Sequence, residues 1–218
     1  MTDFSHWDIA RALLAAARWT VLLSVLAFLA GGLLGLALLM VRTSRRRWLR
    51  TAGWIYIELF QGTPLLAQLF LAFFGLPLIG IETSALTAAG LALALWSAAF
   101  LAEIWRACVE AIPRAQWEAS ASLGMTYPQQ MRHVILPQAV QIAIPSTVGF
   151  AVQVVKGTAL ASVIGFVEVS RASTMIANAS FKPFTAYGLA ALVYFLLCWP
   201  LSKASRLLEK RLDVADRR

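Results

Sequence analysis

The residues with the most informative chemistry are polar side chains that stand inside otherwise apolar stretches. Lys156 lies well inside the apolar run from Ile142 to Phe166, close to Gln153. Polar groups within lipid are energetically costly, so they mark a solute path or a contact between helices. Gly157 can interrupt the helix beside Lys156 and turn backbone groups toward a cavity. The candidates for a solute path are Gln68, Gln153, Lys156, Thr158 and Glu168.

Two of these candidates have a simpler alternative. The Lys156 ammonium can snorkel toward the membrane edge, or pair with a carboxylate such as Glu168. Glu168 follows the outer end of the same apolar run. There it would meet a cationic solute or a binding protein, or remain a solvated loop carboxylate. The sequence leaves these alternatives open.

Several kinds of chemistry lack the residues that they need. His6 and His133 are the only histidines and stand far apart, so no histidine metal cluster is expected. No Gly-x-x-x-x-Gly-Lys-Ser/Thr phosphate loop occurs, so any ATP must be bound by another chain. The only cysteines, Cys108 and Cys198, do not suggest a disulfide framework. We therefore expect no enzyme activity and no cofactor on this chain.

Composition points to a membrane protein. Of 218 residues, 60% are hydrophobic and 14% charged, which leaves too little polar surface to cover a water-soluble globule. The net charge of +8 does not indicate nucleic-acid binding, because the basic residues lie in short gaps between apolar runs. About 20 apolar residues suffice to cross the bilayer. We predict a single all-α domain with about five transmembrane helices, at residues 19–41, 62–81, 86–105, 138–166 and 186–201, preceded by an amphipathic surface helix from Asp8 to Arg18.

The distribution of lysine and arginine predicts the orientation. Basic residues are concentrated at 42–50, at 106–132 and in the tail from 203 to 218. Cytoplasmic loops carry such an excess, so these three regions should face the cytoplasm. The N-terminus would then lie outside and the C-terminus inside. An odd number of spans also argues against two equal inverted halves, and hence favours a chain that works with partner chains.

The connection at residues 106–137 is long enough to be a functional candidate. Ala115 to Leu123 contains strong helix formers, Gly124 is a plausible helix stop, and Pro128 fits the start of a second short helix that ends before Pro137. This pattern predicts a helix-turn-helix at the cytoplasmic face. Pattern alone favours an amphipathic elbow that only reconnects two spans.

The same residues resemble a known motif. Glu118-Ala119-Ser120, Gly124, and Val134, Leu136 and Pro137 are similar in identity and spacing to the Glu-Ala-Ala, Gly, Ile-x-Leu-Pro motif of ABC importer permeases. The resemblance implies a type I ABC importer permease fold, in which this elbow is a coupling segment in a cleft of the ATPase. Glu118 would make the polar docking contact. Gly124 would allow the sharp turn, because glycine tolerates left-handed backbone geometry.

Further segments resemble the polar amino acid uptake branch of that family. Residues 58–68 are similar to its Glu-Leu-Phe-Arg-Gly-Thr-Pro-Leu-Leu block, with Gln61 in place of the usual arginine, and residues 102–106 to its Ala-Glu-x-x-Arg turn. At residues 156–160 the chain has Lys-Gly-Thr-Ala-Leu where the family commonly has two more polar side chains. This departure favours an unlike second permease subunit that completes the substrate site.

The resemblance implies that the chain is one subunit of a multi-subunit transporter. The chain would be the permease subunit of a polar amino acid importer in the bacterial inner membrane. Its partners would be two ATPase subunits that hold ATP and magnesium, a like or unlike second permease, and an extracytoplasmic binding protein. Two alternatives are a non-transporting membrane scaffold or sensor and an ion-driven carrier. The sequence does not specify which amino acid is carried.

Overall fold

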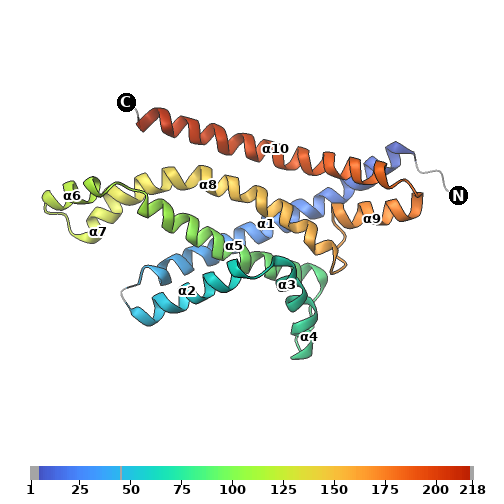
Figure 1. Ribbon diagram of the computed structural model, residues 1–218, viewed down its shortest axis with the longest axis horizontal. Coiled ribbons are helices and arrows are strands. Elements are labelled where there is room, and N and C mark those ends of the chain that lie inside the picture. Colours follow the sequence, from blue (N-terminus) through green and yellow to red (C-terminus); the bar gives the residue numbers. More distant parts are fainter. Residues whose placement is uncertain (1–4, 45, 217–218) are drawn as a thin grey trace.

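The computed structural model describes residues 5–44 and 46–216, and these residues form helices without a β-strand (Figure 1). The all-α prediction is thus confirmed. Two short elements, η1 and η2, are π-helical, and η3 is a 3₁₀-helix. In chain order the elements are α1 His6–Arg42, α2 Arg47–Gly62, α3 Leu65–Phe70, η1 Leu71–Gly75, α4 Leu76–Leu78, α5 Ala85–Glu110, α6 Arg114–Ser122, α7 Tyr127–Gln130, η2 Met131–Ile135, α8 Leu136–Gly157, η3 Thr158–Ser162, α9 Val169–Ser180 and α10 Pro183–Asp216.

Four of the described helical stretches are long and apolar enough to cross a membrane, and a bent helix pair can supply a fifth crossing. The bent pair joins α2 to the α3–α4 arm at an angle of 102°. The predicted second span, residues 62–81, therefore covers only the second half of this broken element. The break falls at Thr63 and Pro64, because the residue before a proline is driven into extended backbone.

The N-terminal part of α1 is not a separate surface helix, and that prediction is wrong. The helix runs unbroken from a Ser5 N-cap, whose capping box with Asp8 satisfies free backbone groups at its start. Ile9 and Leu13 are fully buried in a cluster that includes Val169 of α9 and Val193 of α10. The apolar face that suggested a membrane surface is instead covered by protein.

The α1–α5 contact forms the centre of the bundle. The glycines at positions 31 and 35 let the two backbones approach closely: a Cβ at Gly31 would lie 2.5 Å from Ser97 Cβ, and one at Gly35 would lie 3.2 Å from the Ala98 carbonyl oxygen. This is the close packing expected of small residues four apart. Leu23, Leu93 and other buried side chains fill the adjoining core.

The basic regions gather at one end of the bundle. The connection between α1 and α2, the α6–α7 segment and the last turns of α10 lie toward the same end in Figure 1, whereas α9 and the start of α1 lie at the opposite end. Arg45, Arg217 and Arg218, which belong to these regions, lie outside the described residues. This grouping agrees with the predicted orientation, which itself stays a prediction.

Candidate docking elbow and solute path

The elbow between α6 and α7 is closed by local hydrogen bonds. Gly124 has a φ of 72°, in the left-handed region that favours glycine. Its N–H donates to the Ala121 carbonyl at 2.9 Å, and the Met125 N–H donates to the Ser120 carbonyl at 3.3 Å, the paired bonds of a Schellman helix end. Thr126 then caps α7 together with Gln129. The helix stop predicted at Gly124 is present.

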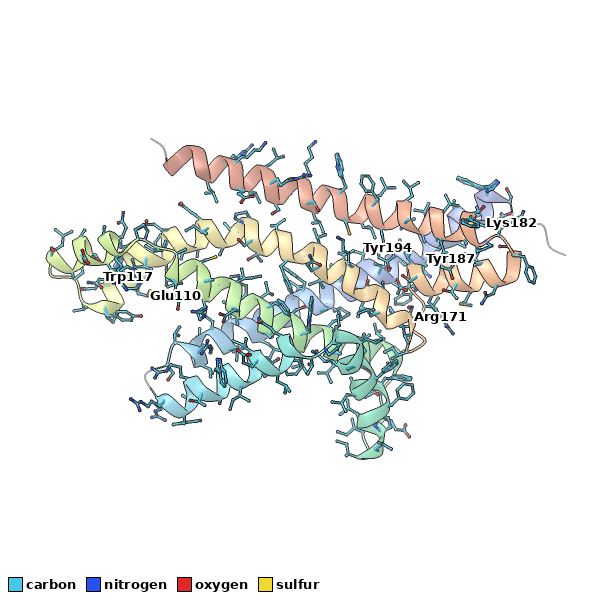
Figure 2. All side chains as sticks on the ribbon, viewed as in Figure 1. Glu110, Trp117, Arg171, Lys182, Tyr187 and Tyr194 are labelled. Atoms are coloured by element: carbon cyan, nitrogen blue, oxygen red, sulfur yellow. The ribbon has the colours of Figure 1, made fainter. Side chains whose placement is uncertain are left out.

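The elbow has a small core of its own. The Trp117 and Tyr127 rings stack with centroids 6.0 Å apart, and thereby join α6 to α7. Ile112 and Ile135 are buried beneath them. The buried Ser120 hydroxyl donates to the Trp117 carbonyl at 2.9 Å. Figure 2 shows Trp117 and Glu110 at the end of the bundle that carries α6. The two helices therefore pack together as one unit.

The motif residues divide between the surface and this core. Glu118, Ala119 and Gly124 are exposed. Ser120 is buried and Val134 packs against the elbow core, so these two maintain its shape. Leu136 and Pro137 are exposed on the first turn of α8. The sequence reasoning missed Leu123, an apolar side chain at the turn that is 81% exposed.

The helix that follows the elbow does not end before Pro137, contrary to the prediction. Helical structure continues from α7 through η2 into α8, and Pro137 occupies the first turn of α8. Proline lacks the N–H of a helical hydrogen bond, and Pro137 closely follows the π-helical turn η2, where the regular α-helical pattern is already changed. The elbow and Lys156 are consequently joined by an unbroken helical path.

Two of the predicted path residues meet in a groove between α8 and α10. Gln153 and Lys156 line a cavity of about 720 Å³, with Tyr194 and Cys198 on the facing helix. Near one end of this groove, the Ser205 hydroxyl of α10 donates to the Pro145 carbonyl of α8 at 2.8 Å. Tyr194 was missed because a tyrosine within an apolar span resembles ordinary packing. The groove is thus lined by an ammonium and an amide, with the tyrosine on the facing helix.

The other predicted path residues lie elsewhere. Thr158 is fully buried, and its hydroxyl donates to the Val155 carbonyl at 2.7 Å, which makes it a helix-end contact. Gln68 lines a separate cavity of about 300 Å³ beside α3. Its amide donates to the Phe60 carbonyl at 2.9 Å and to the Thr63 hydroxyl at 2.9 Å, so it bridges the α2–α3 bend. The structure does not bring either residue to the α8–α10 groove.

Glu168 is not a solvated loop carboxylate, because it is fully buried at the start of α9. Its Oε1 accepts the Arg171 N–H at 2.9 Å, and its Oε2 accepts hydrogen bonds from Tyr194 and Thr20. No ion pair joins it to Lys156 within the described part of the chain. Burial raises the pKa of the Glu168 carboxyl, and these hydrogen bonds partly oppose the shift.

Comparisons with known proteins show which family this chain resembles. A family model described as binding-protein-dependent transport system inner membrane component matches residues 24–214. A probable amino-acid ABC transporter permease of Bacillus subtilis is 38% identical over 193 residues, covering 88% of this chain and 85% of the relative. An L-cystine transport system permease of the same organism is 34% identical over 210 residues, covering 96% and 88%. The crystal structure of an amino acid ABC transporter with histidines matches with a TM-score of 0.89 and 36% identity, over 92% of this chain and 94% of that one.

Proposed function

We propose that this chain carries a polar amino acid across the bacterial inner membrane. The premise is that it belongs to the family of binding-protein-dependent transport system inner membrane components and is a permease subunit of an amino-acid ABC importer. The main structural support is the continuous helical path that links an exposed elbow at α6–α7 to a polar groove at Lys156. The elbow would receive the motion of two ATPase subunits, which hold ATP and magnesium. The groove would receive the solute from an extracytoplasmic binding protein.

The exposed face of the elbow fits a docking role. Glu118 offers a carboxylate, and Leu123 offers an apolar side chain that is 81% exposed. Such an apolar residue on a rigid turn is suited to insertion into a cleft of another protein. The ATPase cleft would bury Leu123 and pair Glu118 with a donor. Because the Trp117–Tyr127 stack fixes the elbow, movement of the cleft would move the whole unit.

The groove between α8 and α10 fits the recognition of an amino acid. The Lys156 ammonium can bind a carboxylate, and the Gln153 amide can donate to or accept from polar side-chain atoms. The groove is open on one side, so a second permease subunit, like or unlike this one, would complete it. A chain with few polar residues in its spans would then form half of a solute path.

Reconstituted transport separates the two roles. Lys156→Gln should raise the KM for the amino acid severalfold and leave assembly of the permease with the ATPase intact. Exposed Lys210→Gln on α10 is the matched control and should leave the KM unchanged. Glu118→Lys should abolish binding-protein-stimulated ATP hydrolysis without changing solute binding to the permease. An unchanged KM in Lys156→Gln would show that Lys156 is not part of the solute path.

Accessibility labelling distinguishes a transporter from a non-transporting scaffold. Single cysteines at Gln153 and Lys156, in a background that lacks Cys108 and Cys198, should react with a water-soluble reagent in at least one nucleotide state. A scaffold predicts that both positions stay unreactive in every state. Transport that persists without the ATPase would instead identify an ion-driven carrier.

A further inference from the structure

A second groove lies on another face of the molecule, between α1, α5 and α8. Its deeper part has a volume of about 340 Å³ and an almost entirely apolar lining that includes Val140, Ala143 and Ile144 of α8. Val140 and Ile144 are 52% and 45% exposed. The groove is therefore an open apolar slot and not a filled core.

The apolar slot opens into a wider, polar-edged cavity at the end of the bundle that carries the elbow. This second cavity has a volume of about 800 Å³ and shares Leu36, Leu39, Val109 and Leu136 with the slot. Arg114, Thr43 and the stacked Trp117 and Tyr127 complete its wall. The two cavities form one continuous site with an apolar body and a polar mouth.

The charge of the mouth favours an anion. Arg106 and Glu110 line it, but they are ion-paired with each other, and Arg106 also pairs with Glu103. Arg114 is exposed, and none of the ion pairs among the described residues involves it. Its guanidinium can therefore bind a phosphate in bidentate fashion.

The length of the slot fits one leaflet of a bilayer. Along α8 the slot extends from Leu136 to Val148. Twelve residues of α-helix rise by about 18 Å. Half of a hydrocarbon core of about 30 Å is similar in length. One acyl chain therefore matches the slot in length and in apolarity.

We propose that this groove binds an anionic glycerophospholipid of the inner leaflet, with one acyl chain in the slot and its phosphate at Arg114. The proposal rests on the proposed membrane orientation, which puts the mouth beside the negatively charged cytoplasmic surface. The bound lipid lies between α1 and the elbow, so it would brace the elbow at the position where the ATPase docks.

Photolabelling of the wild-type complex provides the direct test. The permease–ATPase complex is placed in nanodiscs that contain phosphatidylglycerol with a photoreactive acyl chain. Labelling should concentrate on Val140 and Ile144, and phosphatidylcholine with the same chain should label them less. Equal labelling by both lipids, or labelling spread along the lipid-exposed face of α1 at Leu33, would overturn the proposal.

Matched variants test the two ends of the site. Arg114→Gln should lower the phosphatidylglycerol preference about fivefold, the effect of one basic residue near an anionic surface, whereas exposed Arg50→Gln, outside the groove, should leave it unchanged. Ala143→Phe should fill the slot and reduce labelling at Ile144. If Arg50→Gln acts as strongly as Arg114→Gln, the attraction is nonspecific and the site is rejected.

A groove covered by protein instead of lipid would be detected by cross-linking. Cysteine cross-linking between Val140 and a second permease subunit would show that protein fills the slot, and this outcome also overturns the proposal. Failure of the lipid site would leave amino acid transport and the Glu118 effect intact, so it is distinguishable from failure of the proposed function.

Discussion

The Tyr194 hydroxyl donates a hydrogen bond to Glu168 Oε2, which ties α10 to the start of α9. The same carboxylate oxygen accepts the Thr20 hydroxyl of α1 at 3.5 Å, and the Ser170 hydroxyl lies 3.0 Å from the Tyr194 hydroxyl. Three helices thus meet at one buried carboxylate. Tyr194 also lines the α8–α10 groove, so the cluster fixes part of its wall.

This cluster predicts strong coupling between two substitutions. Glu168→Ala should lower the free energy of unfolding by about 1–3 kcal/mol, because it leaves buried donors without an acceptor. Tyr194→Phe alone should cost less, and the double variant less than the sum of the two. Thermal unfolding of the purified complex measures each term. Additive effects would show that the two side chains do not act together.

The raised pKa of Glu168 predicts a dependence of stability on pH. The folded protein retains the carboxyl proton at higher pH than the unfolded chain, so stability falls as pH rises from the usual glutamate pKa of about 4.3 through the raised value. Glu168→Gln should flatten this slope, whereas the exposed Glu82→Gln should not. Unfolding temperatures across this interval provide the measurement, and an unchanged slope in Glu168→Gln would contradict the assignment.

The turn at Gly124 predicts a local effect on coupling. Gly124→Ala forces a side chain into the left-handed region, at a cost of roughly 1–2 kcal/mol. The elbow should loosen, and binding-protein-stimulated ATP hydrolysis should fall. Gly188→Ala, in α10 with open space around the new methyl group, serves as control. Equal hydrolysis by both variants would show that coupling does not depend on the turn.

Two adjacent glycines in α1 predict opposite outcomes. A methyl group at Gly31 would meet Ser97 at 2.5 Å, so Gly31→Ala should destabilise the protein by about 1–3 kcal/mol through overpacking. Gly32 has no neighbouring atom within 4 Å, and Gly32→Ala should be neutral or stabilising because alanine favours helix. Thermal unfolding of the two variants in parallel distinguishes them. Similar losses would show that α1 and α5 separate easily.

Local patterns in the sequence anticipated the features that depend on local chemistry. The Gly124 stop and the Pro128 helix start follow from backbone geometry, and the structure contains both. The helical content and the apolar runs likewise reflect composition. These properties require no knowledge of what lies across the fold.

Features that depend on distant partners were not predictable in this way. Glu168 looked like a loop carboxylate because the two hydroxyls that donate hydrogen bonds to it, those of Thr20 and Tyr194, come from two other helices. The apolar face at Ile9 looked like a membrane surface because α9 and α10 cover it only in the folded chain. The continuation through Pro137 was hidden because proline marks both the end of one helix and the first turn of another.

The continuous path from α7 to α8 has a mechanical consequence. Ser205 of α10 holds this path at the Pro145 carbonyl, about 22 Å of helix from Gln130 on one side and about 17 Å from Lys156 on the other. Such a contact would act as a fulcrum. When the elbow moves toward the bundle axis, the Lys156 end of the same helix would move away from that axis by a comparable distance. Closure at the elbow end would thus become opening at the Lys156 end.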